Sequence, residues 1–131
     1  MSNKKITIGF SGHRDKKADW FELKEYFDFY ENQSYEVTVV HGGAIGFDTQ
    51  VNRVVNRLRT KYKYNIKKPV VIRPNYDKYG SKFAPLKRNE EIVQMSDIMI
   101  ILWDERQKGG TWYTIKCANK LEKTIYFMEV I

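Results

Sequence analysis

The sequence predicts an α/β fold of the Rossmann-like, doubly wound type, in which helices cover both faces of a mostly parallel five-stranded sheet. Short apolar, β-branched runs alternate with longer amphipathic segments along the chain, which is the pattern of repeated strand–helix units. Several of these runs are continuously apolar, and this indicates strands that are buried on both faces. We expect residues 1–131 to form a single domain.

Five apolar runs are predicted as strands. Branched and aromatic residues dominate them, because such side chains pack well on a pleated sheet. The strands are expected at Lys5–Phe10, Tyr35–Val40, Pro69–Arg73, Asp97–Trp103 and Thr124–Met128. The first of them is ended by Ser11-Gly12.

Four segments with apolar residues at helical spacing are predicted as helices. In the first, these residues are Trp20, Leu23, Phe27 and Tyr30, with Asp15 or Asp19 as the N-cap. The other three helices are expected at Asp48–Arg59, Pro85–Met95 and Thr111–Leu121. Proline suits the start of the third helix, because the first turn does not use its N–H groups.

The composition favours an anionic partner. Lys and Arg number 23 against 16 Asp and Glu, which gives a net charge of +7 and suits either a nucleotide or a nucleic acid. The single cysteine, Cys117, excludes an intramolecular disulfide and a cysteine metal cluster. No apolar run approaches the ~18 residues of a membrane span, and no signal-peptide pattern opens the chain. We therefore expect a cytoplasmic protein without a membrane partner.

The loops after the predicted strands carry the candidate binding residues. In an open α/β sheet, ligands bind beyond the carboxyl ends of the strands. Glycine lets a phosphate reach the N–H groups at a helix start, and basic side chains add charge-assisted hydrogen bonds. The candidates are Ser11, Gly12, His13, Arg14, His41, Gly42, Gly43, Ala44, Gly46, Asp48, Arg88, Asn89, Trp103, Gly109, Gly110 and Thr111. Together they predict an anion pocket, with Lys87 and Lys108 nearby and with Trp103 and Phe47 flanking a base.

Other kinds of site are disfavoured. His13 and His41 lie in separate loops, and no carboxylate spacing completes a metal set. The lysine of a P-loop is missing after Gly46. Ser11-Gly12-His13 does not form a nucleophile elbow. We predict no metal and no cofactor.

Four motifs resemble those of the SLOG superfamily, named after the DNA-processing (Smf) proteins and the LOG cytokinin-activating enzymes. They are Ser11–Arg14, Gly42–Asp48, Arg88–Glu91 and Gly110-Thr111. The likeness spans Ile6 to Phe127 and is greatest to small single-domain bacterial and phage members. It implies a Rossmann-like fold that binds a nucleotide or a nucleotide-derived ligand, often as a dimer.

The resemblance also bears on catalysis. In the LOG enzymes, a phosphate-binding Gly-Gly-x-Gly-Thr loop is followed three residues later by a catalytic glutamate, whose position falls on Thr114. The catalytic arginine of that family falls on Arg88. Gln107-Lys108 stands where the first two glycines of the loop would be. Anion binding is thus expected to be retained and acid–base chemistry lost, unless Glu90 or Asp104 substitutes.

Three functions follow as hypotheses. The first is a non-catalytic nucleotide sensor or sequestering module, and the second is a LOG-like nucleoside monophosphate phosphoribohydrolase. The third is a DNA-binding module like the DNA-processing proteins, to which the basic segment Lys61–Lys68 (KYKYNIKK) contributes, unless that segment is only a solvated connection. A homodimer or higher homo-oligomer is also expected, because several aromatic residues do not fit one core stripe: Phe21, Tyr26, Phe29, Tyr76 and Tyr79.

Overall fold

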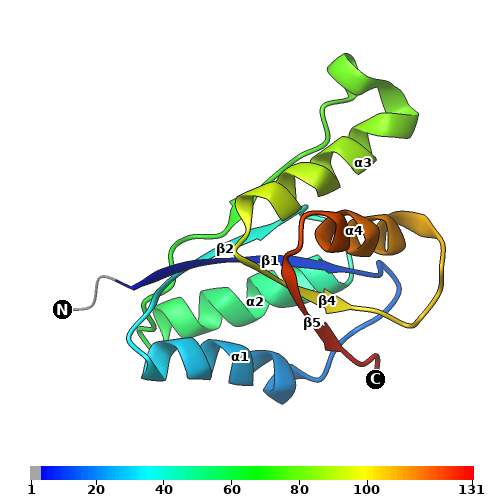
Figure 1. Cartoon of the computed structure of the whole chain (residues 1–131). Helices are drawn as coiled ribbons and strands as arrows, with labels where there is room; N and C mark the ends of the chain where they lie inside the picture. Colours follow the sequence, from blue (N-terminus) through cyan, green and yellow to red (C-terminus); the bar gives the residue numbers. More distant parts are fainter. Residues whose placement is uncertain (1–3) are drawn as a thin grey trace.

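The computed structural model describes residues 4–131, in which strands and helices alternate along the chain (Figure 1). The strands are β1 (Lys5–Gly12), β2 (Glu36–His41), β3 (Val70–Val71), β4 (Ile98–Leu102) and β5 (Thr124–Met128). The helices are α1 (Trp20–Asn32), α2 (Phe47–Thr60), α3 (Tyr76–Met95) and α4 (Gly109–Lys120). None of the helices in this described part combines the length and the apolar character that a membrane crossing needs.

The five strands form one sheet in the order β3-β2-β1-β4-β5, and every neighbouring pair is parallel. The predicted α/β fold with a parallel five-stranded sheet is therefore confirmed. The strand order reverses between β1 and β4, where Gly9 pairs with Met99. The carboxyl ends of β1, β2 and β4 consequently meet at one edge, on both sides of the switch point at which such sheets bind ligands.

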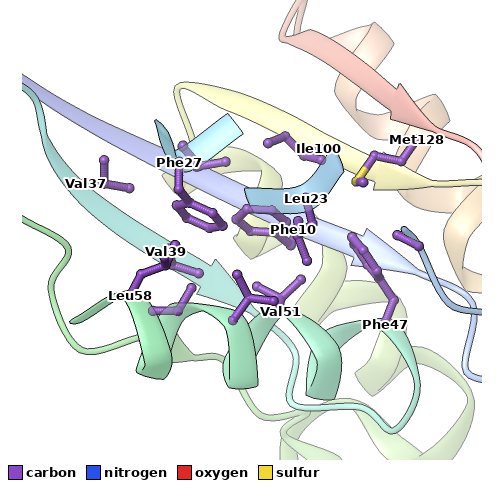
Figure 2. Close-up of a cluster of buried hydrophobic side chains, with 14 of the residues drawn as sticks. Phe10, Leu23, Phe27, Val37, Val39, Phe47, Val51, Leu58, Ile100 and Met128 are labelled. Atoms are coloured by element: carbon purple, nitrogen blue, oxygen red, sulfur yellow. The ribbon is translucent and has the colours of Figure 1, made fainter. Parts of the chain in front are cut away.

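Both faces of the sheet are covered, as the continuous apolar runs predicted. In β4, Ile100 and Leu102 pack on the side of α1 and α2, whereas Met99 and Ile101 pack on the side of α3 and α4. Figure 2 shows the first layer, whose centre contains three buried phenylalanines: Phe10, Phe27 and Phe47. Burial of each such side chain contributes about 1.5–3 kcal/mol to folding. The sheet is thereby fixed between two helical layers.

The structure differs from the sequence prediction mainly around β3 and α3. The third strand is limited to Val70–Val71 at the sheet edge, where it pairs with β2 alone. Helix α3 begins at Tyr76, after the side chain of Asn75 as N-cap, and not at Pro85. Gly80 interrupts it with a φ of 78°, so the proline lies within the segment that follows this kink. In Figure 1 the start of α3 extends away from the sheet.

The other boundaries lie within about two residues of those expected, and Asp19 caps α1. Of the aromatic residues expected outside the core, Tyr26 is half-buried. The exposed ones are Phe21, Phe29, Tyr76 and Tyr79. Association of copies through these side chains stays a prediction.

The close packing of the loop after β1 on the start of α2 leads to a prediction about Gly46. Gly46→Ala is expected to lower the free energy of unfolding by about 2 kcal/mol more than Gly80→Ala. Both glycines have a positive φ, 86° and 78°, so alanine is strained at either. A Cβ at Gly46 would lie 2.3 Å from the carbonyl oxygen of Arg14, whereas nothing lies within 4 Å of one at Gly80. Urea unfolding measures the difference, and equal losses would contradict the prediction.

Candidate functional site

A pocket of about 360 Å³ lies at the carboxyl edge of the sheet, between the loops that follow β1, β2 and β4. It brings together candidates that are far apart in the sequence: Ser11, Gly12, His13, Arg14, Gly42, Ala44, Asp48, Arg88, Asn89, Gly109, Gly110 and Thr111. Phe10, Asp15, Ile92, Arg106 and Lys108 complete the lining. The pocket thus combines several cations with two glycine-bearing loops.

Four candidates lie outside this lining: His41, Gly43, Gly46 and Trp103. The ring of His41 is buried, accepts the N–H of Gly43 at Nδ1 over 2.9 Å and lies 3.1 Å from Oδ1 of Asn52 through Nε2. It therefore fixes the loop and does not face a ligand.

The two aromatic residues expected beside a base have other roles. Phe47 is wholly buried and packs against Phe10, with ring centroids 6.2 Å apart. A Cβ at Gly12 would lie 2.6 Å from the Phe47 ring, so this glycine makes room for a core side chain. Trp103 stacks on Trp112 at 5.6 Å, and its indole N–H donates to the carbonyl of Arg106. Neither ring lines the pocket, and the prediction that they flank a base there is wrong.

Asp48 organises the glycine-rich loop after β2. Its Oδ2 accepts the backbone N–H groups of Gly42 and Ala44 at 3.2 and 3.1 Å. Its Oδ1 is buried and has no hydrogen-bond partner among the described residues. Burial raises the pKa of this carboxyl, while His41, the two N–H groups and Arg88 oppose the shift. Asp48 thus lines the pocket and keeps a buried oxygen whose hydrogen-bonding capacity the described residues leave unused.

Because Asp48 and His41 take the N–H groups of residues 42–44, this loop does not offer them to a phosphate. The glycines instead make room for an arginine: a Cβ at Gly42 would lie 2.4 Å from Nη1 of Arg88. That nitrogen donates to the carbonyl of Gly42 at 2.9 Å. The expectation that Gly42 and Gly43 give a phosphate access to their N–H groups is therefore corrected.

Arg88 and Asn89 link the loop after β2 to the start of α4. Nε of Arg88 donates to Oδ1 of Asn89 at 2.8 Å, and Nδ2 of Asn89 lies 3.4 Å from the carbonyl of Gly110. Burial lowers the pKa of Arg88, which nevertheless remains a cation at neutral pH. The Arg-Asn pair thus positions one charge between two loops.

A second cluster links the loops after β1 and β4. Nε2 of His13 lies 3.0 Å from Oδ1 of Asp104, and burial lowers the pKa of the histidine. Arg106 binds both oxygens of Asp104 and reaches Asp15 at 3.3 Å. Its guanidinium holds the pKa of Asp104 well below its usual range. Sequence reasoning missed Arg106 and Asp15; the spacing of Asp104 and Arg106 after an apolar strand was the available signal.

Helix α4, whose first residues line the pocket, differs from the other helices in how its N–H groups are capped. Helix α1 is capped by Asp19 and α3 by Asn75, but α4 has no side-chain cap. The N–H groups of its first turn, at Gly109, Gly110 and Thr111, are those that a helix leaves free. Helix α2 also lacks a side-chain cap, but the N–H of Phe47 donates to the carbonyl of His13 at 3.4 Å. The start of α4 thus has no side-chain cap and borders the pocket, an arrangement that favours an anion.

The residue at the position of the LOG-type glutamate, and the two acids that could replace that glutamate, all form structural contacts. Thr114 is buried, and its hydroxyl donates to the carbonyl of Gly110 at 3.0 Å. Glu90 accepts the hydroxyl of Tyr113 at 2.7 Å and pairs with Lys87, and Asp104 is held by Arg106. Neither carboxylate lines the pocket. Of the two acids that do line it, Asp15 is paired with Arg106, which leaves Asp48.

Comparisons with known proteins identify no family for this chain. No family model matches the chain, and no curated protein matches it. Among solved structures, the chain is similar to the C-terminal domain of a hydrogenase from Pyrococcus furiosus, with 14% sequence identity and a TM-score of 0.47. The match covers 95% of this chain and 91% of that chain. A likeness this distant carries no inference about a ligand or a reaction.

The buried carboxyl of Asp48 predicts a specific pH dependence of stability. Its pKa is higher in the folded chain than in the unfolded one, so its contribution to stability is fully present at low pH and is lost as the pH rises through the folded pKa. Asp48→Asn removes this titration and keeps one oxygen for the two N–H groups. The unfolding free energy of the wild type relative to Asp48→Asn should therefore fall as the pH is raised from about 4, the pKa of an aspartate in an unfolded chain, through the raised pKa of the folded state. Urea titrations across this range measure it, and a constant or rising difference would contradict the assignment.

Proposed function

We propose that this protein binds a nucleotide or a nucleotide-derived ligand through its phosphate, as a non-catalytic sensor or sequestering module. One observation carries the proposal. Arg14, Arg88 and Lys108 line the same pocket as the uncapped start of α4, and none of the three forms an ion pair with a carboxylate within residues 4–131. Cations that meet a free helix start favour a phosphate group.

The carboxyl group of Asp48 favours a ligand that carries a ribose beside that phosphate. Its buried Oδ1 has no partner in the described part of the chain, and a buried acceptor without a partner is costly. A sugar hydroxyl donates the hydrogen bond that this oxygen lacks, as acidic residues do for ribose in dinucleotide-binding folds. A nucleotide therefore suits the pocket better than inorganic phosphate does.

Binding without catalysis is favoured by Thr114, because a buried hydroxyl bonded to the helix backbone cannot serve as a general base. The alternative is a nucleoside monophosphate N-glycosidase. For that reaction Asp48 is the candidate carboxylate, since it lines the pocket with Arg88 and has a raised pKa. Two N–H groups hold its other oxygen in place, which suits a binding role.

Calorimetry with AMP and adenosine tests the proposal. We expect AMP to bind and adenosine to bind far more weakly, because the phosphate contacts supply most of the affinity. The double variant Arg14→Gln/Lys108→Gln should weaken AMP binding by about tenfold or more. Lys116→Gln is the matched control, since Lys116 is exposed on α4 and does not line the pocket.

Two outcomes of that experiment would overturn the proposal. Equal affinities for AMP and adenosine would show that the pocket does not recognise a phosphate. Release of free adenine during prolonged incubation, abolished by Asp48→Asn, would replace the binding function with the glycosidase alternative. Chromatography of the incubated sample separates AMP from adenine.

A nucleic acid strand is the second candidate partner, and a groove along α2 favours it. The groove has a volume of about 930 Å³, includes Trp20 and contains no acidic residue in its lining. Its exposed cations are Lys17, Arg53, Arg57 and Lys61. Three of them are spaced four residues apart and so share one face of the helix. The segment Lys61–Lys68 contributes less, because Lys67 pairs with Glu36 and Tyr64 donates to Asp28.

Salt dependence tests this second candidate. If all four cations contact phosphates of a single strand, the affinity should fall about 50-fold between about 50 and 200 mM salt. Arg53→Gln/Arg57→Gln should halve the slope, since two of the four contacts are removed. Fluorescence anisotropy with a labelled oligothymidylate measures both quantities. Absence of binding at the lower salt concentration eliminates this candidate.

A further inference from the structure

A second pocket, of about 520 Å³, adjoins the first, and Arg88 lines both. Its other basic residues are Arg73, Lys78 and Lys87, and its aromatic residue is Tyr79. Most of its lining comes from α3, on both sides of the kink at Gly80. In Figure 1 the start of this helix extends away from the sheet. Arg88 therefore separates two neighbouring spaces that both contain cations.

The paired glycines after β2 seat two arginines side by side. A Cβ at Gly42 would lie 2.4 Å from Nη1 of Arg88, and one at Gly43 would lie 2.6 Å from Nη1 of Arg73. Each guanidinium thus occupies the space that a side chain on the glycine would fill. The two guanidinium groups therefore lie at neighbouring positions against this glycine pair, in which Gly43 also has a positive φ of 69°.

These charges are only partly neutralised within the described chain. Arg14 and Arg73 both act on Arg88 as like charges, and Asp48 is the carboxylate that opposes them. Neither Arg73 nor Lys78 forms an ion pair among residues 4–131, whereas Lys87 pairs with Glu90. Glu91 is the remaining acid of the second pocket, so the cations still exceed the acids there. A row of arginines with a single buried counter-charge favours a ligand with more than one anionic group.

We propose that the second pocket is a further phosphate subsite, so that the ligand is a nucleotide with two separate phosphate groups, such as a dinucleotide. This inference rests on the proposed nucleotide binding at the first pocket. One phosphate lies at the start of α4 with Arg14 and Lys108. The other lies with Arg73 and Lys78, and Arg88 is placed between them. The exposed ring of Tyr79 lies in the second lining and can stack on a second base.

Three probes distinguish this inference from the proposed function itself. AMP carries one phosphate, ADP carries two adjacent phosphates, and 5′-phosphoadenylyl-adenosine (pApA) carries two phosphates separated by a nucleoside. Calorimetry on the wild type should show that pApA binds about tenfold more tightly than AMP or more. The affinity for ADP should exceed that for AMP by much less, because we expect the second phosphate of ADP not to reach the second pocket.

Substitutions in the second pocket then test whether the extra affinity for pApA arises there. Arg73→Gln/Lys78→Gln should remove the advantage of pApA and leave the affinity for AMP unchanged. Lys82→Gln is the matched control, because Lys82 is exposed on α3 and does not line the second pocket. Thermal unfolding of each variant establishes that it is folded. Because the two substituted residues are exposed, we expect the unfolding temperatures to be close to that of the wild type.

The measurements distinguish a failure of the proposed function from a failure of the second phosphate subsite. If AMP does not bind to the wild type, the proposed function fails together with this inference. If AMP binds but pApA gains nothing, or gains no more than ADP, only the second subsite is overturned. An advantage of pApA that persists in Arg73→Gln/Lys78→Gln also overturns it, because the extra contacts must then lie elsewhere.

Discussion

The site depends on one buried carboxylate. Asp48 holds the loop after β2 through the N–H groups of Gly42 and Ala44, and Arg88 rests on the carbonyl of Gly42. Glycine loses more backbone entropy on folding than any other residue, and this loop contains two consecutive glycines. The hydrogen bonds to Asp48 offset part of that loss. The second oxygen of the same residue stays buried without a partner among the described residues, and in the proposed function it accepts a ribose hydroxyl. Structural support and the proposed ligand selection therefore share one side chain.

Two polar connections extend that order across the sheet edge. One runs from Gly42 through Arg88 and Asn89 to Gly110, and the other runs from His13 through Asp104 to Arg106. Together they link the loops after β1, β2 and β4 with the helix start at α4. A site whose loops are connected before binding loses little entropy when a ligand arrives. This preorganisation suits recognition of a ligand without a large conformational change.

Much of the fold could be predicted from the sequence, because the periodicity of apolar residues and the run DIMIILW report burial directly. The convergence of the glycine-rich loops followed from the parallel sheet. The predictions that failed concern residues whose positions depend on tertiary contacts. Phe47 looks like an exposed loop aromatic, but the missing side chain of Gly12 admits it to the core. Helix α3 begins at Tyr76, upstream of Pro85, because Asn75 caps an additional helical segment before the kink at Gly80. The roles of Gly42 and Gly43 depend on arginines distant in the sequence.

The central claim is that the free N–H groups at the start of α4 receive a phosphate. Amide correlation spectra of ¹⁵N-labelled protein, titrated with AMP, test it most directly. We expect the largest shifts at Gly109, Gly110 and Thr111, whose N–H groups no side chain caps. The N–H groups of Gly42 and Ala44 should shift less, because Asp48 already holds them. Unchanged spectra, or shifts confined to the outer face of α2, would contradict the account.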